Sequence, residues 1–193
     1  MSEKGSHSDV FTVGPLFSFT HTPSHFLLGV VDMLLALLFL MSYLSLSVLL
    51  SWRDIRTGLL PDCYNCPLLW LGLLYHLVCM PSLLPDAVWG AVGGYLAFAA
   101  IYWGYFFLRR REGLGYGDIK LLAALGAWHG WQALPQLAFI AALLGSCFVL
   151  TLFVAKRSTQ ALKNPLRFGP FLATAGLITG CLNIQSTVSL LAL

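Results

Sequence analysis

Apolar residues along this chain gather into long runs that are separated by short polar segments. Four of the runs contain at most one Asp, Glu, Lys or Arg: residues 26–50, 87–108, 121–155 and 168–193. Runs of roughly 20 apolar residues are long enough to cross a bilayer as helices. The pattern therefore predicts six membrane-spanning helices, at 26–50, 66–81, 86–108, 118–131, 133–155 and 168–191.

The composition agrees with a membrane protein and disagrees with a water-soluble domain. Hydrophobic residues make up 58% of the 193 residues and charged residues only 10%, whereas a soluble domain has about 25% charged residues. We predict an all-α, polytopic membrane protein, with a polar N-terminal tail over residues 1–25 and a single membrane-embedded domain over residues 26–193. The formal net charge of +3 is too small to indicate binding to nucleic acid.

Lysines and arginines gather in three of the five predicted connections. They are Arg53 and Arg56 in the first, Arg109 to Arg111 and Lys120 around the third, and Lys156, Arg157, Lys163 and Arg167 in the fifth. Six alternating spans place these connections on one side of the membrane and leave only Lys4 on the other. Because Lys and Arg mark the cytoplasmic side, we predict that these three connections are cytoplasmic and that both termini face outward.

The fourth predicted span is unusually short. From Asp118 to Trp128 a helix extends only about 16 Å at 1.5 Å per residue, which is less than the hydrocarbon thickness of a bilayer. We therefore expect Asp118 to lie in a recess below the cytoplasmic surface. At the other end of this span, residues 128–131 read Trp-His-Gly-Trp, a composition typical of an aromatic belt at the outer interface.

Three carboxylates fall on the predicted cytoplasmic side: Asp54 and Asp62 after the first span, and Asp118 at the start of the fourth. Two carboxyl groups brought together at a lipid boundary resist joint ionisation, so that one holds a proton while the other stays charged. This is the arrangement of an aspartic protease. The charged carboxylate takes a proton from an attacking water molecule, and the protonated one stabilises the carbonyl oxygen.

The residues also admit structural interpretations. Asp118 follows a glycine at a helix start, so it could act as an N-cap. Asp86, in the outer turn before the third predicted span, could cap a helix in the same way. Asp54 could pair with Arg53 or Arg56. In that case the chain would be a membrane protein without catalytic activity, such as a small transporter or an assembly factor, although transporters place binding carboxylates near the membrane midplane.

Three segments together resemble the type IV prepilin peptidase family, whose members are GxGD aspartic proteases. They are Asp54 followed by Leu60-Pro61-Asp62, the string Gly115-Tyr116-Gly117-Asp118-Ile119-Lys120, and the string from Asn164 to Ala173, which reads NPLRFGPFLA. A lone GxGD string would be weak evidence. Three matches in the same order as in the family, over residues 54–175, make the resemblance specific.

The resemblance implies a membrane aspartic endopeptidase with Asp54 and Asp118 as the catalytic pair. Gly115 and Gly117 would let the backbone turn tightly beside the substrate, and Asp62 and Lys120 would support the site. The implied partners are the lipid bilayer and a prepilin or pseudopilin precursor of a type IV pilus or type II secretion system, with a short basic leader before a hydrophobic helix. The implied location is the bacterial inner (cytoplasmic) membrane, with the site at the cytoplasmic face.

The chain departs from longer family members in one respect. These carry an N-terminal cytoplasmic region with two CxxC pairs, linked to methylation of the new N-terminus, and the first span here leads directly to Asp54. Cys63 and Cys66 form a lone CxxC, and a structural zinc site needs four ligands. We therefore expect peptidase activity without methyltransferase activity, and no metal or other cofactor. The sequence carries no signal for an oligomeric state.

Overall fold

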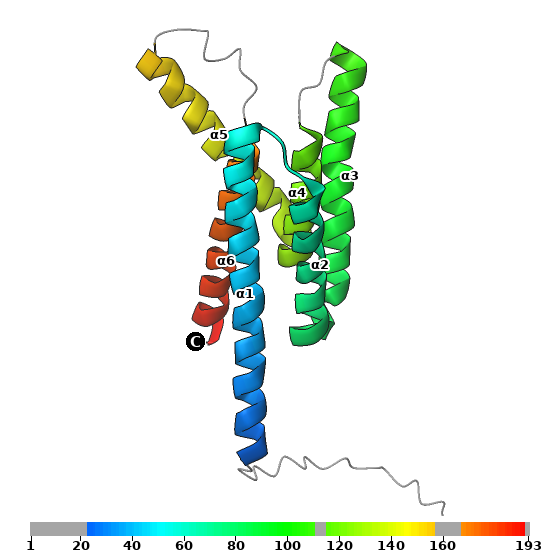
Figure 1. Cartoon of the computed structure of the whole chain (residues 1–193), viewed down its shortest axis with the longest axis vertical. Helices are drawn as coiled ribbons and strands as arrows, with labels where there is room; N and C mark the ends of the chain where they lie inside the picture. Colours follow the sequence, from blue (N-terminus) through cyan, green and yellow to red (C-terminus); the bar gives the residue numbers. More distant parts are fainter. Residues whose placement is uncertain (1–22, 111–114, 157–166, 192–193) are drawn as a thin grey trace, which may run out of the picture.

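The computed structural model describes residues 23–110, 115–156 and 167–191, and all of its elements are helices (Figure 1). The prediction of an all-α fold is therefore confirmed. The elements are α1 Pro23–Thr57, α2 Asp62–Cys79, η1 Pro81–Leu83, α3 Leu84–Arg109, α4 Tyr116–His129, η2 Trp131–Ala133, α5 Leu134–Lys156 and α6 Gly169–Leu191. Arg111, Arg157, Lys163 and the segment 164–166 lie outside the described residues.

Helix α1 is longer than the first predicted span, which ended at residue 50. The sequence placed Asp54 and its two neighbouring arginines in a connection, but α1 continues to Thr57 and holds all three. Leu50 and Asp54 are four residues apart and are both buried, so they share the inward face of one continuous helix. The guanidinium groups of Arg53 and Arg56 instead lie over the rings of aromatic residues. The end of the apolar run therefore does not mark the end of the helix.

Helix α4 lies in the middle of the bundle and packs against α2, α3 and α6. Every residue from Leu121 to Ala127 is buried. The backbones of α3 and α4 touch at two glycines: a Cβ atom built at Gly90 would lie 2.1 Å from the carbonyl oxygen of Gly126. Small residues at such crossings allow helices in membranes to approach closely, and here they place α4 directly against α3.

Of the two tryptophans in the predicted interfacial belt, Trp131 of η2 is exposed, whereas Trp128 near the end of α4 points into the bundle. The indole Nε1 of Trp128 donates a hydrogen bond to the Leu68 carbonyl oxygen at 2.8 Å, inside the bundle. The space for this ring is left by Gly72 of α2, where a Cβ atom would lie 2.8 Å from the indole. Because α2 provides both the space and the acceptor, Trp128 points inward.

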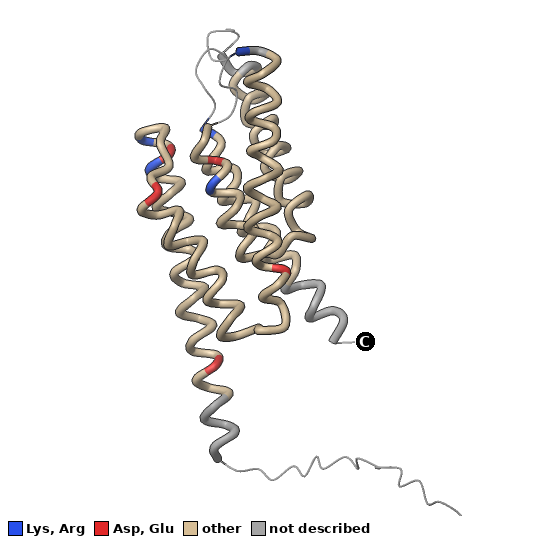
Figure 2. Tube along the Cα trace, turned by 90° about the vertical axis from the view of Figure 1, so that its right-hand side faces the viewer, with Lys and Arg blue, Asp and Glu red and all other residues tan. Residues whose placement is uncertain are grey.

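Three segments of the described chain are long and apolar enough to cross a membrane: Gly29–Thr57, Pro81–Leu108 and Trp131–Leu152. This confirms the membrane character of the protein. Helix α4, with 14 residues, is not among them, so the set of six spans stays a prediction. The lysines and arginines coloured in Figure 2 lie near one end of the bundle, where α1 and α3 end and α2, α4 and α6 begin.

Candidate active site

Asp54 lies near the C-terminal end of α1 and is buried, with 4% of its surface exposed. The backbone N–H of Gly169, the first residue of α6, donates a hydrogen bond to its Oδ2 atom at 3.0 Å. The N-terminus of a helix is a favourable place for a negative charge. A Cβ atom at Gly169 would lie 2.7 Å from that same oxygen, so the contact requires a glycine.

Asp118 is the third residue of α4 and is also buried, with 6% of its surface exposed. The residue that precedes the helix is Gly115, and no side chain caps this helix start by a hydrogen bond. The N-cap interpretation of Asp118 is therefore wrong. Its Oδ1 atom has no hydrogen-bond partner among the described residues, and its Oδ2 atom would lie 3.1 Å from a Cβ atom built at Gly115.

The fold brings these two carboxyl groups together from helices that are distant in the sequence. Asp54 is close enough to Asp118 for the charge of one to act on the other. The hydrogen bond that Asp54 makes in the described structure comes from Gly169, and neither of the neighbouring arginines forms an ion pair with it there. The charge of Arg167, just before α6, also acts on Asp54. Two buried carboxyl groups whose charges act on each other resist joint ionisation, which favours a state with one proton on the pair.

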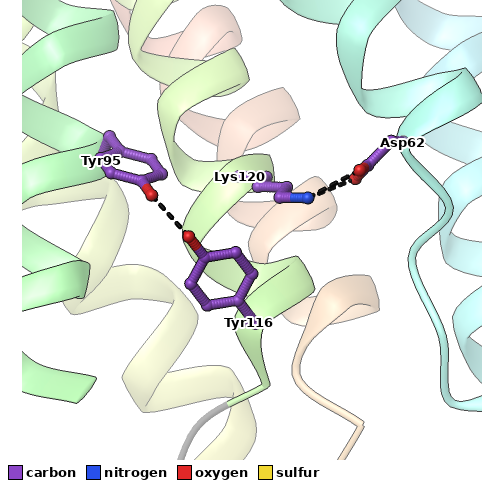
Figure 3. Close-up of polar contacts among 4 residues, drawn as sticks. All are labelled: Asp62, Tyr95, Tyr116 and Lys120. Atoms are coloured by element: carbon purple, nitrogen blue, oxygen red, sulfur yellow. Dashed lines mark hydrogen bonds and ion pairs between the residues drawn. The ribbon is translucent and has the colours of Figure 1, made fainter. Parts of the chain in front are cut away.

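Asp62 of α2 and Lys120 of α4 bind each other, as Figure 3 shows. The Nζ atom of Lys120 lies 2.7 Å from both carboxylate oxygens of Asp62. The side chain of Asp62 is 59% exposed, whereas those of the two buried aspartates are almost covered. The structure thus brings Asp54 and Asp118 together and gives Asp62 a separate, cationic partner.

The two glycines of the Gly115–Asp118 segment leave room for neighbouring atoms, and their backbone angles are not unusual. Gly115 has φ −69° and ψ 133°, which other residues adopt, and positive φ among the described glycines occurs at Gly58 and Gly130. Neither glycine has the positive φ that would require a glycine, and the expected role of the two glycines beside the substrate stays a prediction. A Cβ atom at Gly117 would lie 2.7 Å from the Cβ atom of Leu60, so this glycine lets α4 pack closely against the segment between α1 and α2.

Sequence reasoning missed three residues of this region. Gly169 lies inside the NPLRFGPFLA string, which could have pointed to it, but its hydrogen bond to Asp54 joins residues that are 115 positions apart. Tyr95 of α3 and Tyr116 of α4 join their hydroxyl groups at 2.6 Å (Figure 3). No signal in the sequence predicts that pair, because aromatic residues are frequent in both helices.

The described residues contain no cluster of three or more His, Cys, Asp or Glu side chains that would suit a metal ion. Cys63 and Cys66 are free thiols on the exposed side of α2. They lie one turn of helix apart, and no histidine or carboxylate among the described residues joins them in a ligand set.

Comparisons with known proteins agree with this arrangement. The model of the type IV leader peptidase family matches residues 41–150. Leader peptidase HopD of Salmonella typhimurium (strain LT2) is 59% identical over 77% of this chain and 95% of its own length. Leader peptidase HopD of Escherichia coli is 57% identical over 74% of this chain and 91% of its own length.

A longer relative matches in part. The prepilin leader peptidase/N-methyltransferase of Dickeya chrysanthemi is 48% identical over 78% of this chain, which corresponds to 52% of the length of that protein. No solved structure matches the chain.

Proposed function

Because the chain belongs to the type IV leader peptidase family, we propose that it is a membrane aspartic endopeptidase that cleaves the leader from prepilin-like or pseudopilin precursors. The observation that carries the proposal is the pair of buried carboxyl groups that α1 and α4 bring together, Asp54 and Asp118. Relatives named leader peptidase and prepilin leader peptidase support the substrate class.

The reaction needs one ionised and one protonated carboxyl group. Asp54 accepts the N–H of Gly169 at the start of α6, and a hydrogen bond of this kind favours the ionised form. We assign it the role of base, which takes a proton from the attacking water. Asp118 has an oxygen without a partner among the described residues, and in this assignment it holds the shared proton and donates it as a hydrogen bond to the carbonyl oxygen of the scissile peptide bond.

The rest of the cycle follows from proton balance. Attack of water on the carbonyl carbon gives a tetrahedral intermediate, in which Asp118 stabilises the developing oxyanion. Asp54, now protonated, gives its proton to the departing amine nitrogen, and the C–N bond breaks. The pair returns to its singly protonated state with the leader released as a carboxylic acid and the mature chain as an amine.

The location of the site belongs to the same proposal. The lysines and arginines of Figure 2 lie at the end of the bundle where α1 ends and α4 begins, and basic residues mark the cytoplasmic side. We therefore place the site at the cytoplasmic face of a bacterial inner membrane, with both termini in the periplasm. A substrate with a basic leader and a hydrophobic helix would then meet the carboxyl pair where its helix leaves the bilayer.

The experiment that tests the function is co-expression with a candidate prepilin, followed by separation of precursor and mature band on a gel. Wild type is compared with Asp54→Asn and Asp118→Asn, and with Asp32→Asn as the matched control, since Asp32 is an exposed carboxylate elsewhere on α1. The mature band should be present for wild type and Asp32→Asn and absent for the other two. A panel of precursors that wild type leaves uncut would favour a non-catalytic homologue or a transporter.

A further inference from the structure

The first turn of α4 is tied on both sides to its neighbours by polar side chains, as Figure 3 shows. On one side Lys120 binds both carboxylate oxygens of Asp62, the first residue of α2. On the other side the hydroxyl group of Tyr116 bonds to that of Tyr95 on α3. The Nζ atom of Lys120 also lies 5.3 Å from the centre of the Tyr116 ring, so the two ties are adjacent.

Asp118 lies between the two ties in the sequence, and its own side chain is weakly held. Its Oδ1 atom has no partner among the described residues, and α4 begins without a side-chain cap. The orientation of this carboxyl group must therefore come from the position of the backbone that carries it. That backbone is fixed by Tyr116 and Lys120, two residues before and two residues after.

The ion pair between Asp62 and Lys120 is better suited to fixing the position of nearby groups than to raising the free energy of unfolding. An ion pair as exposed as Asp62 and Lys120, with 59% and 32% of the side chains exposed, contributes little to the folding of a whole domain. The position of a reacting group is a more sensitive quantity, because a displacement of about 1 Å can cost up to about 100-fold in rate. A contact that is weak for stability can therefore be strong for catalysis.

We propose that Asp62, Lys120, Tyr95 and Tyr116 are positioning residues that fix the first turn of α4 and thereby hold Asp118 in place against Asp54. This inference rests on the proposed function of the two buried aspartates. The four residues touch neither substrate nor the reacting atoms in this scheme. They act on the reaction through the placement of Asp118.

The test is steady-state cleavage of a prepilin by the purified, full-length protein in detergent or lipid. Asp62→Asn and Lys120→Met each remove the ion pair with little change in size. We expect kcat to fall about tenfold in each variant, in the range for displaced catalytic groups, with KM unchanged because the substrate contacts remain. Tyr116→Phe and Tyr95→Phe should lower kcat by a smaller factor, and Tyr105→Phe, an exposed tyrosine of α3, is the matched control.

A rescue experiment separates positioning from other roles. The exchanged pair, Asp62→Lys together with Lys120→Asp, restores an ion pair with reversed polarity, and it should recover much of the lost kcat. The conservative variant Lys120→Arg should retain most of it. The double-mutant cycle for Asp62→Asn with Lys120→Met should show that the second change adds little to the first.

Three outcomes would overturn the inference. The first is a wild-type kcat in both single variants. The second is a raised KM with unchanged kcat in Asp62→Asn, which would make Asp62 a contact for the leader. The third is a kcat of the exchanged pair that is no higher than that of the single variants. Asp118→Asn in the same assay keeps the two proposals apart. One result would reject only the positioning role and leave the proposed function intact. In that result wild type cleaves the prepilin, Asp118→Asn does not, and Asp62→Asn and Lys120→Met cleave as fast as wild type. Cleavage by Asp118→Asn at the wild-type rate would reject the function itself.

Discussion

The two buried aspartates reach the same site by different means. Asp54 lies near the end of the long helix α1, and a backbone N–H from the start of α6 binds its carboxylate directly. Asp118 lies at the start of the short helix α4, and one of its oxygens has no partner among the described residues. Its position follows from how α4 is seated against α2 and α3. Asp54 is therefore oriented by a hydrogen bond, whereas Asp118 is positioned by the packing of α4 against α2 and α3.

This difference separates two requirements of aspartic catalysis. A base must stay ionised when buried, and a donated hydrogen bond serves that need at Asp54. A proton donor needs an oxygen that is free to meet the substrate, and an oxygen already occupied by the protein would not serve. The unpartnered oxygen of Asp118 is therefore consistent with the role that we propose for it.

Replacing either aspartate by asparagine should lower the rate of prepilin cleavage by at least about 100-fold, since general acid–base groups contribute 100- to 10,000-fold. The loss should be deeper for Asp54→Asn, because an amide at position 118 can still donate a hydrogen bond while an amide at position 54 cannot act as a base. Single-turnover rates of purified variants measure both. The reverse order would contradict our assignment of the shared proton.

Adding a methyl group beside each aspartate probes how tightly each is held. In Gly169→Ala the new Cβ atom would lie 2.7 Å from Oδ2 of Asp54, whereas in Gly115→Ala it would lie 3.1 Å from Oδ2 of Asp118. We expect kcat to fall on the order of tenfold or more for Gly169→Ala and less for Gly115→Ala. Gly104→Ala on α3, where a Cβ atom meets no other atom within 4 Å, is the control. Equal losses at positions 169 and 115 would contradict the comparison.

The pH dependence of cleavage should be bell-shaped. Activity requires one proton shared by the pair, so it should fall at low pH, when both carboxyl groups are protonated, and at high pH, when both are ionised. Each limb should change about tenfold per pH unit beyond its midpoint and reports a property of the pair, not of one residue. Measurement of kcat/KM across pH gives both limbs. A profile with a single limb would mean that only one of the two aspartates titrates in the reaction.

The smallest effect should come from Arg167, whose charge acts on Asp54 from an exposed position. Exposed charges are screened by salt over about 8 Å at physiological ionic strength. Arg167→Gln should therefore change kcat/KM by about twofold or less at that ionic strength, and somewhat more at low salt. A loss comparable to that of the aspartate variants would show that Arg167, and not Gly169 alone, holds Asp54.

Much of the fold follows from the sequence alone. The six predicted spans correspond to the six α-helices, with bounds that differ by a few residues at most ends, because apolar runs have few other structures open to them in a bilayer. The shortness of the fourth helix is confirmed in α4, which has 14 residues, and the expected recess of Asp118 below the cytoplasmic surface stays a prediction. The two catalytic candidates came from the resemblance in the motifs, and the structure brings them together.

What the sequence could not predict depends on contacts between distant segments. The apolar run predicts that the first helix ends at residue 50, whereas the charged residues beyond that run continue α1 to Thr57. The sequence predicts Trp128 at the interface, whereas the space for its ring beside Gly72 exists only once α2 and α4 are packed. The bond from Gly169 to Asp54 has the same character. Local patterns determine helices, while the neighbours of each helix determine where its polar groups point.

The shortness and burial of α4 have a consequence for the biogenesis of the protein. A helix of 14 residues is below the length of about 20 that inserts stably into a bilayer by itself, so we expect α4 to settle last, after α2 and α3 have paired. Gly90→Leu, which would obstruct the contact with Gly126, should then leave the other helices protected from added protease but abolish cleavage. The newly synthesised chain would thus carry no complete dyad, and completion of membrane assembly would itself activate the enzyme.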